Sequence, residues 1–449
     1  MRSALLLIAI TCLFRPISSP GECTLLKSGN SAPADSELAR LQQMAGGGDP
    51  CAQYSVGVLH EEGRGVPQDF AKALYWYRLA AERGLTEADT KLGVLYQYGD
   101  GVSPDPAEAA KWFRRAAEHG DAAAQYSLGL LLSADRGLPP DYADAAKWFR
   151  LAAQQGSVDA QNHLAILYQK GQGVAQDYSE AMKWFRSAAL QGDAMGRYNV
   201  AVLYQDGLGV PQDYGEALKW LRLAANQGLP RAQYDLGIAY VKGLGAAKNE
   251  SEAVKWFRLA ADQNDALSQS NLGVMYANGW GVSQDYREAM RLYRLAADQK
   301  LVGAQLNIAF LYLNGQGVSQ DYREALRWFQ MAANEEDPEA KYNIGVLYEQ
   351  GLGVIHDSKE ACKWWKMAAD QGHAQAQYNL AFMYEYGYGV QQDFAQAYLW
   401  YALAAAAAPS NLNAVRGRDG ARQQLSPDKA TRMEELIQDW KPVTHSPAK

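Results

Sequence analysis

Apolar and small side chains recur every 36 residues along most of the chain, from Asp49 to Ala408. An Ala-Ala pair keeps this frame through ten successive units without insertion or deletion. A tryptophan column keeps it as well, with Leu292 as its one exception: Trp76, Trp112, Trp148, Trp184, Trp220, Trp256, Trp328, Trp364 and Trp400. A period of roughly 20 to 50 residues indicates a solenoid, a propeller or another array of repeats.

Each unit contains two helical stripes that are joined by a glycine-rich turn. In the first unit the second stripe spaces apolar or small residues three or four positions apart, at Phe70, Ala73, Leu74, Tyr77, Ala80 and Ala81. This spacing traces one face of a helix. The stripe at 52–62 is also helical, and Gly63-Arg64-Gly65 separates the two. The second glycine of this turn is present in all ten units, where it supplies the backbone freedom for a tight reversal.

Polar residues mark the ends of the second helix of each unit. A column of N-cap residues precedes it: Asp69, Asp105, Asp141, Asp177, Asp213, Asn249, Asp285, Asp321, Asp357 and Asp393. Glutamate follows three residues later in seven units, which predicts a capping box. Glycine ends the helix in six units. Asn264, Lys300 and Glu336 take its place in three others, so the sequence defines the curvature of units six to eight less well.

A single helical hairpin cannot bury its apolar face, so we expect neighbouring units to stack. A column of glycine and alanine that includes Gly57 and Ala165 predicts a close approach of two helices. The tryptophan and alanine columns together predict a seam in which large side chains pack against small ones. Loss of one buried tryptophan from such a seam would destabilise the fold by about 3–5 kcal/mol.

The fifth unit carries the fullest form of the repeated motif. It reads Tyr198-Asn199-Val200-Ala201-Val202-Leu203-Tyr204, then Gly207-Leu208-Gly209-Val210-Pro211-Gln212-Asp213-Tyr214, followed by Ala217, Trp220, Ala224-Ala225 and Gly228. These residues resemble the Sel-1-like repeat family, a tetratricopeptide-like class, over about four fifths of the chain. The resemblance implies an all-α, right-handed superhelical solenoid of ten helix-turn-helix repeats with helical caps. Asp135 in the third unit and 246–249 in the sixth depart from the motif.

The repeat frame predicts the organisation of the whole chain. The predicted parts are a signal peptide at 1–21, an N-terminal arm and capping helix at 22–48, repeats at 49–84, 85–120, 121–156, 157–192, 193–228, 229–264, 265–300, 301–336, 337–372 and 373–408, and C-terminal capping helices with a loose tail at 409–449. A helix is expected from Ser36 to Met44. Another, from 411 to 424, is expected to be interrupted at Gly417 and Gly420, and Ser426 should N-cap a third.

The N-terminal segment has the outline of an export signal. Met1-Arg2-Ser3 is a positive start, and the apolar run at 4–14 is too short to span a bilayer of about 30 Å as a helix. We therefore expect a periplasmic or extracellular protein. The alternatives are an uncleaved apolar N-terminus or a start codon chosen too early. Cys23 and Cys51 could pair after export, although two unpaired thiols are the simpler expectation. Cys362 is expected to be a small core residue.

Composition narrows the classes of function. Apolar and aromatic residues make up 48% of the chain and charged residues 21%, which disfavours wholesale disorder and a membrane bundle. The net charge of −7 disfavours a nucleic-acid partner. Lysine and arginine form two columns with the period of the repeat, the first beginning at Lys111 and the second at Arg114. The glutamates three residues before the first column predict a solvated, partly ion-paired face, with a basic stripe for anionic ligands as the alternative.

Residues that could carry catalysis or bind metal are scattered. The six histidines form no HExxH motif and the cysteines form no CxxC pair, so we expect neither a metal nor another cofactor. Ser426-Pro427-Asp428-Lys429 matches the SxxK motif of serine acylases, but the partner motifs are absent and a helix cap explains it. Members of the resembling family with paired cysteines in each repeat are linked to β-lactam hydrolysis, and this chain lacks those pairs.

The remaining candidates are surface residues for binding. By resemblance to tetratricopeptide arrays, the first helices should line the concave side, and variable residues near their ends should face a ligand. These candidates, with two aromatic residues between the loop glycines, are Glu61, Glu62, Gln97, Tyr98, Gln205, Asp206, Trp280, Glu349, Gln350, Glu385, Tyr386 and Tyr388. The sequence thus predicts a non-enzymatic scaffold for protein partners. A polysaccharide-binding envelope protein is the first alternative, and a β-lactam or cell-wall hydrolase is the second.

Overall fold

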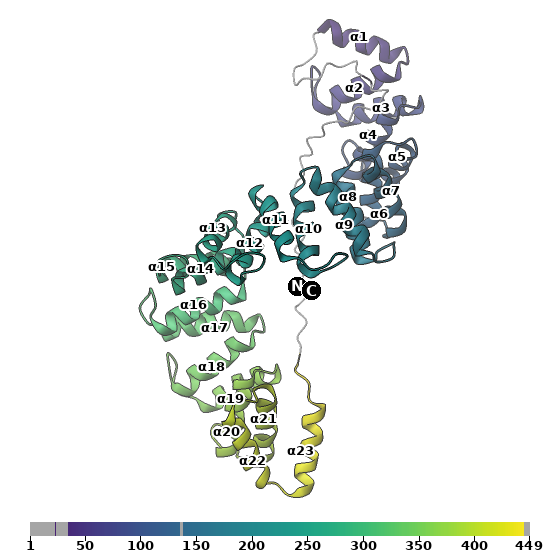
Figure 1. Ribbon diagram of the computed structural model, residues 1–449. Helices are drawn as coiled ribbons and strands as arrows, with labels where there is room; N and C mark the ends of the chain where they lie inside the picture. The colour runs from purple at the N-terminus through teal and green to yellow at the C-terminus, as the bar shows by residue number, and fades with distance from the viewer. Residues whose placement is uncertain (1–22, 24–34, 135–137, 444–449) are drawn as a thin grey trace. The chain divides into compact units, whose positions relative to one another are not determined.

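The computed structural model describes residue 23 and the segments 35–134 and 138–443, which contain 23 helices and no strand (Figure 1). The predicted signal peptide and Asp135 lie outside these residues. Up to residue 212 the helices are α1 Asp35–Gly46, α2 Pro50–Glu62, α3 Phe70–Glu82, α4 Thr86–Tyr98, α5 Pro106–Glu118, α6 Ala122–Ser133, α7 Tyr142–Gln154, α8 Val158–Lys170, α9 Tyr178–Leu190 and α10 Ala194–Asp206. From residue 213 they are α11 Tyr214–Asn226, α12 Pro230–Lys242, α13 Glu250–Asp262, α14 Ala266–Asn278, α15 Tyr286–Asp298, α16 Val302–Asn314, α17 Tyr322–Asn334, α18 Pro338–Gln350, α19 Ser358–Asp370, α20 Ala374–Tyr386, α21 Phe394–Ala407, α22 Leu412–Gln423 and α23 Pro427–Asp439.

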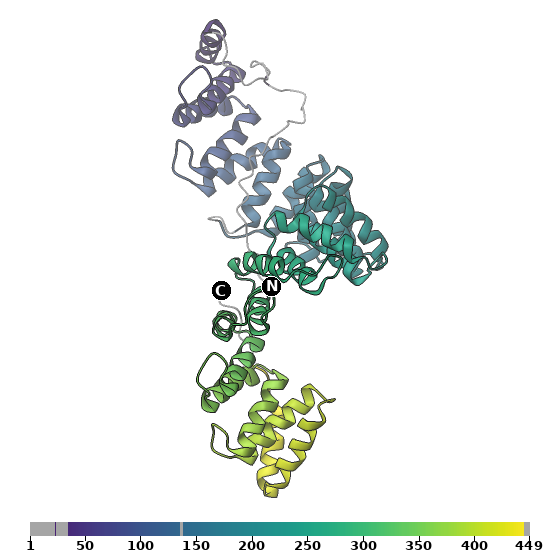
Figure 2. The same cartoon turned by 90° about the vertical axis from the view of Figure 1, so that its left-hand side faces the viewer.

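The chain forms two compact units, which meet in sequence between Gln212 and Asp213. Within each unit, consecutive helices pack against one another, first inside a repeat and then between the second helix of one repeat and the first helix of the next (Figure 2). The all-α solenoid that the sequence predicts is therefore confirmed. Among the described residues no helix is long and apolar enough to cross a bilayer.

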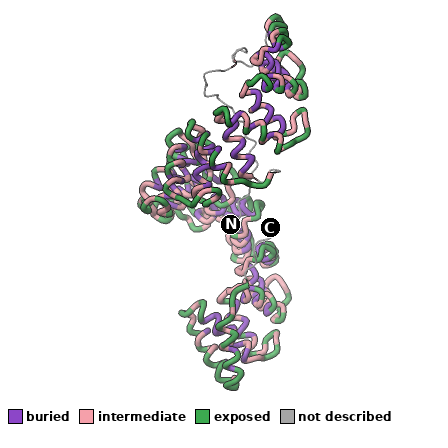
Figure 3. The backbone as a smooth tube through the Cα atoms, turned by 90° about the vertical axis from the view of Figure 1, so that its right-hand side faces the viewer, coloured by how far each residue is buried: buried purple, intermediate pink, exposed green. Residues whose placement is uncertain are grey.

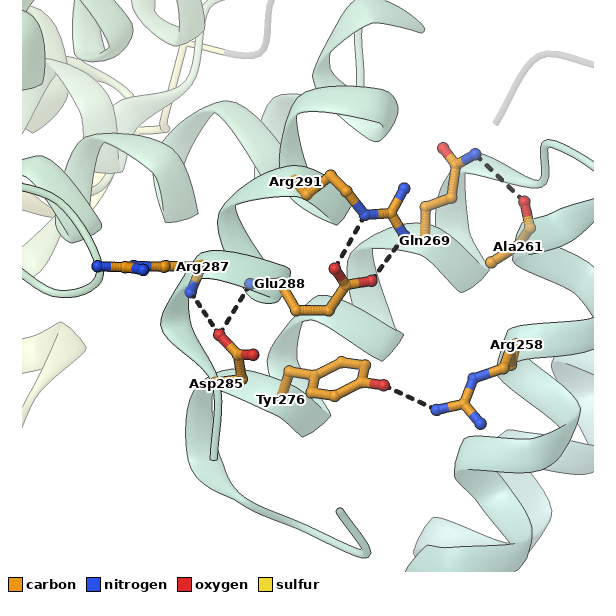
Figure 4. A network of polar contacts seen from close by, with 8 residues as sticks. All are labelled: Arg258, Ala261, Gln269, Tyr276, Asp285, Arg287, Glu288 and Arg291. Atoms are coloured by element: carbon orange, nitrogen blue, oxygen red, sulfur yellow. Dashed lines mark hydrogen bonds and ion pairs between the residues drawn. The ribbon is translucent and has the colours of Figure 1, made fainter. Parts of the chain in front are cut away.

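The second helices begin as predicted, but only half of each capping box forms. In the seventh repeat the Asp285 carboxylate accepts hydrogen bonds from the backbone N–H groups of Arg287 and Glu288, at 2.9 and 3.0 Å (Figure 4). The backbone N–H of Asp285 donates to the Tyr276 carbonyl at the end of the preceding helix, at 2.9 Å. Because that N–H is already satisfied, the Glu288 carboxylate binds Arg291 instead, and the predicted reciprocal bond is wrong.

In eight of the described turns, the second glycine has a further role beyond reversing the chain. Gly281 has a φ of 68°, and a Cβ at this position would collide with the backbone of Glu250 and Ser251 in the preceding repeat. Gly173 meets the backbone of Tyr142 in the same way. The turn of one repeat thus rests on the start of the second helix of the repeat before it, and only glycine permits this approach.

The core differs from the predicted seam. The small column packs against the residue after each tryptophan: a Cβ on Gly57 would lie 2.7 Å from the Tyr77 ring, and one on Gly93 2.5 Å from the Phe113 ring. Tyr77 and Phe113 are fully buried, whereas only Trp148 and Trp400 of the tryptophan column are buried and the others are half-buried. Figure 3 shows buried segments of the backbone along the helices of each pair. Half-buried tryptophans instead pack against the edges of these cores, as Trp112, Trp184, Trp328 and Trp364 do.

A ladder of buried polar side chains also links neighbouring repeats. The amide of Gln269 donates to the Ala261 carbonyl, at 3.4 Å (Figure 4). Its oxygen accepts a bond of 2.9 Å from Gln299, the residue that follows α15. Gln125 and Gln161 make the same contacts in their repeats. Because these amides are buried, each bond satisfies a group that would otherwise destabilise the fold.

Three repeat junctions keep their shape without glycine. Asn264, Lys300 and Glu336 have φ values of 66°, 63° and 65°, in the left-handed region that glycine occupies at the other junctions. A left-handed residue other than glycine costs about 1–2 kcal/mol. The stacking of the repeats therefore imposes this turn on the local sequence.

The two ends carry the predicted caps, with two differences. Helix α22 runs through Gly417 and Gly420 without interruption. A Cβ on Gly417 would lie 2.6 Å from the Tyr401 ring, so this glycine admits a neighbouring helix rather than breaking its own. At the N-terminal end, Cys23 and Cys51 form a disulfide with a Cα–Cα separation of 5.2 Å, where unpaired thiols were the simpler expectation.

Candidate functional site

The basic columns on the second helices are largely paired. Seven of the first column form ion pairs with the glutamate three residues earlier, among them Lys183 with Glu180 at 3.2 Å and Lys219 with Glu216 at 2.6 Å. Arginines of the second column donate to a tyrosine hydroxyl of the next repeat, as Arg258 does to Tyr276 at 2.7 Å (Figure 4). The prediction of a paired, solvated face is confirmed: the first column pairs within its own helices, and arginines of the second column link neighbouring repeats.

The twelve candidate residues lie at the ends of first helices or in the turns after them. Seven are exposed: Glu62, Tyr98, Asp206, Trp280, Gln350, Tyr386 and Tyr388. The other five are half-buried: Glu61, Gln97, Gln205, Glu349 and Glu385. The structure brings Glu349 and Gln350 together in the wall of one cavity and places Tyr386 beside Tyr388. Trp280 lies in the turn of the seventh repeat, with 45% of its surface exposed.

An exposed aromatic patch covers the end of α20 and its turn. It consists of Phe382, Tyr386 and Tyr388, which are 38%, 52% and 51% exposed. The rings of Tyr386 and Tyr388 lie 6.0 Å apart with an interplanar angle of 19°, and Phe382 is 4.6 Å from Tyr386. Sequence analysis found the two tyrosines but missed Phe382, because that column holds aliphatic residues in most repeats.

A cavity of about 360 Å³ adjoins this patch, between the ninth and tenth repeats. We call it the repeat-nine cavity, and its lining residues are Tyr342, Val346, Glu349, Gln350, Trp365, Tyr378, Asn379, Phe382 and Met383. A second cavity of about 260 Å³ between α16 and α18 shares Val346 and Gln350 with it. The two cavities therefore lie on either side of Val346 and Gln350. A larger cavity lies beside Pro139, next to residues outside the described segments.

The carboxylate of Glu349 has an unusual environment in the repeat-nine cavity. Its Oε2 atom is buried and has no hydrogen-bond partner among the described residues. Its Oε1 atom lies 3.9 Å from Nε2 of His356, whose side chain is 61% exposed. Burial, and then the negative charge of Glu349, raise the pKa of the Cys362 thiol to about 12. Cys362 is therefore an unreactive thiol in the core, as predicted.

The equivalent carboxylate in the first repeat is fully paired. Glu61 accepts a hydrogen bond from the Tyr77 hydroxyl, and Lys91 of the second repeat donates to both of its oxygens at 2.9 and 3.0 Å. Burial, and then the negative charge of Glu61, raise the pKa of Tyr77, so the phenol stays protonated and continues to donate. In the tenth repeat Glu385 accepts a bond of 2.7 Å from Tyr401.

Seven lining residues of the repeat-nine cavity escaped sequence analysis: Tyr342, Val346, Trp365, Tyr378, Asn379, Phe382 and Met383. Comparison between repeats could have found two of them. Trp365 stands in the column of Tyr77, and Asn379 stands in the column of Lys91. The aligned columns show that the residues differ from those of the first site, but only the structure shows that their N–H groups donate elsewhere than to Glu349.

The residues that could support catalysis or bind metal lie apart. Among the described residues no three histidine, cysteine, aspartate or glutamate side chains form a group that could hold a metal ion. Ser426 and Lys429 are both exposed at the start of α23, so nothing there excludes water from an acyl intermediate.

Comparisons with known proteins agree with the repeat architecture. The model of the Sel1 repeat matches residues 52–85, 86–121, 122–157, 158–193, 194–229, 230–265, 266–301, 302–337, 338–373 and 374–408. The chain is similar to the crystal structure of a protective antigen present in uropathogenic Escherichia coli strains that displays an SLR fold, with 35% identity and a TM-score of 0.75. That match covers 90% of this chain and 86% of the other.

A second solved structure, a Sel1 repeat protein from Oxalobacter formigenes, is 31% identical with a TM-score of 0.56. The match covers 73% of this chain and 89% of the other chain. A comparison with curated proteins found no match. The family model spans all ten repeats and the helical pairs of both units have the expected form, so the chain belongs to the Sel1 repeat family.

Proposed function

We propose that the chain is a non-enzymatic scaffold that binds other proteins in an exported or envelope compartment. Repeat folds of this kind are typically protein-interaction scaffolds. One observation supports the proposal most directly. The last residue of the first helix is exposed in nine repeats and differs chemically among them: Glu62, Tyr98, Lys170, Asp206, Lys242, Asn278, Asn314, Gln350 and Tyr386. A constant core thus presents a surface that varies from one repeat to the next, which suits recognition of a large partner.

A photo-crosslinking residue at position 386 tests this function. The matched control places the same residue at position 219, where Lys219 is exposed on a second helix. In native cell envelopes we expect crosslinks to a small set of proteins from position 386 and far fewer from position 219. Equal capture at both positions, or no protein adduct at either, would contradict the scaffold function.

The disulfide supports the proposed compartment. Disulfides persist in secreted and periplasmic proteins and are rare in the cytosol, and Cys23 pairs with Cys51 in the described part of the chain. Rapid alkylation in intact cells, followed by denaturation, tests this point. An exported, mature protein should show Cys362 as its one free thiol until a reductant is added. Free Cys23 and Cys51 before reduction would count against export.

The aromatic patch favours polysaccharide as the second candidate ligand. The nearly parallel, exposed rings of Tyr386 and Tyr388 offer an apolar face to a sugar. Glycan-array binding that is lost in Tyr386→Ala and Tyr388→Ala, but kept in Trp280→Ala, would favour this function. The hydrolase alternative has less support, because Ser426 is an exposed helix-cap residue.

A further inference from the structure

We infer that the repeat-nine cavity binds a lysine side chain of a protein partner, with Glu349 as the counter-charge. This inference rests on the scaffold function proposed above and names the chemistry that one of its sites recognises. Three observations support it: the paired glutamate of the first repeat, the loss of both its donors in the ninth, and the shape and lining of the cavity.

The first repeat shows what this position holds when it is filled. Lys91 extends from α4 to Glu61 on α2 and donates to both carboxylate oxygens, while Tyr77 donates from α3. The side chains of Lys91 and Glu61 are 31% and 19% exposed, so this is a partly buried ion pair. In this one pair of repeats, therefore, a lysine side chain occupies the place beside the glutamate.

The ninth repeat lacks both donors. Trp365 replaces the tyrosine, and its indole N–H donates to the Tyr342 carbonyl at 3.1 Å instead. Asn379 replaces the lysine; it bonds to the Tyr342 hydroxyl, and its Oδ1 accepts a bond of 3.2 Å from Gln375. Glu349 keeps its column, but Oε2 is left buried without a partner within the described segments. A buried carboxylate oxygen without a donor is unfavourable. Because Oε2 is covered, an ammonium group satisfies it only after the Glu349 side chain turns toward the cavity, and the gain in binding free energy comes from that change.

The cavity suits the rest of a lysine side chain. Of the described residues that line it, Glu349 alone is charged, while Tyr342, Trp365, Tyr378 and Phe382 supply aromatic surface. Aromatic rings attract ammonium groups and pack against the methylene stem. A volume of about 360 Å³ is in the range that organic ligands occupy. The adjoining cavity of about 260 Å³ offers space for a neighbouring side chain, which favours a polypeptide over a free amine.

Binding of a lysine analogue to the full chain tests this inference. The probe is Nα-acetyl-lysine N-methylamide, and the neutral control is the norleucine analogue, which keeps the stem and lacks the ammonium group. The readout is the indole N–H signal of Trp365 in protein labelled with ¹⁵N-tryptophan, assigned with Trp365→Phe. We expect the lysine probe to shift this signal saturably, and the norleucine control to bind at least tenfold more weakly, because the charge-assisted bond to Glu349 is absent.

Two variants of the cavity and one matched control sharpen the test. Glu349→Gln should weaken the lysine probe about tenfold or more. Asn379→Lys should abolish binding, since it places in the cavity the lysine that the second repeat supplies to Glu61. Glu61→Gln removes the equivalent carboxylate where it is already paired, so the affinity should be unchanged. Circular dichroism checks that each variant folds. If Glu349→Gln does not fold, Asn379→Lys still tests the site, because it keeps Glu349.

Three outcomes would overturn the inference: no shift of the Trp365 signal, equal binding of the lysine and norleucine probes, or unchanged affinity in both cavity variants. These outcomes differ from a failure of the scaffold function. If position 386 still crosslinks to envelope proteins in the Asn379→Lys variant to the wild-type level, the scaffold function holds and the lysine site is wrong. If it crosslinks to none in the wild type, the scaffold function itself fails.

Discussion

The first and ninth repeats hold a glutamate at the same position of the same helix, yet its surroundings differ. Glu61 is bound by Tyr77 and Lys91 from neighbouring helices, and so forms part of the fold. Glu349 meets Trp365 and Asn379 instead and faces a cavity. The repeat fixes the position of a side chain, and the residues on the neighbouring helices decide whether it forms an ion pair within the fold or faces a cavity.

A second position of the same two repeats shows a related contrast. Gln53 of the first repeat donates to the Ala45 carbonyl at 3.2 Å, in the amide ladder that other repeats share. Lys341 takes this place in the ninth repeat, is 2% exposed, and donates to Glu336 and to Gln371. Glu336 itself stands where Gly48 precedes the first repeat, and it keeps a left-handed φ of 65°. In the ninth repeat, therefore, two departures from the common pattern occur together: the buried Lys341 pairs with Glu336, which replaces the junction glycine.

The largest expected effect concerns the core of the ninth repeat. Trp365→Ala should lower the free energy of unfolding by about 3–5 kcal/mol, because it empties a buried site that Gly345 borders. Trp364→Ala is the matched control and should cost roughly half as much, since Trp364 is half-buried. Urea unfolding followed by circular dichroism measures both. A larger loss for Trp364 would show that the tryptophan column carries the core after all.

An intermediate effect is expected at the buried lysine. Glu336→Gly removes the strain of a non-glycine residue at a left-handed φ, which stabilises the fold by about 1 kcal/mol. It also leaves the Lys341 ammonium with Gln371 as its remaining described partner, which destabilises the fold. We expect a net loss of about 1 kcal/mol, because Glu336 is 48% exposed and its pairing is partly screened. Adding Lys341→Gln restores the arrangement of the first repeat and should recover wild-type stability or more. Thermal unfolding of the two variants checks this, and a single variant as stable as the wild type would contradict it.

The smallest effect comes from exchanging the partners of the two glutamates. Lys91→Asn should lower stability by about 0.5–1 kcal/mol, and Asn379→Lys should raise it by a similar or smaller amount, because both pairs are only partly buried. Both differences should shrink in about 1 M salt, which screens charges beyond about 3 Å. Unfolding curves at low and high salt measure them. An Asn379→Lys variant less stable than the wild type at low salt would mean that the cavity does not accept a lysine.

Part of the candidate site could be predicted from the sequence. Glu349, Gln350, Tyr386 and Tyr388 were found because they lie at the ends of first helices, which the repeat frame locates. Trp365 was missed because an aromatic residue is ordinary in that column, and its lack of a donor toward Glu349 depends on the direction of its indole N–H. Asn379 was missed for a similar reason, since the direction of its side-chain amide depends on the fold: the amide bonds to the Tyr342 hydroxyl instead of Glu349.

The sequence by itself determined the helical pairs, their 36-residue period and the aspartate caps, because these depend on contacts within a few residues. The tertiary structure alone decided which of two adjacent bulky columns enters the core. Trp76 and Tyr77 are neighbours on one helix, and only the approach of Gly57 selects Tyr77. It also decided that Cys23 meets Cys51 and that Glu349 lacks a donor among the described residues. Such outcomes depend on how separate helices come together, which the spacing along one helix does not specify.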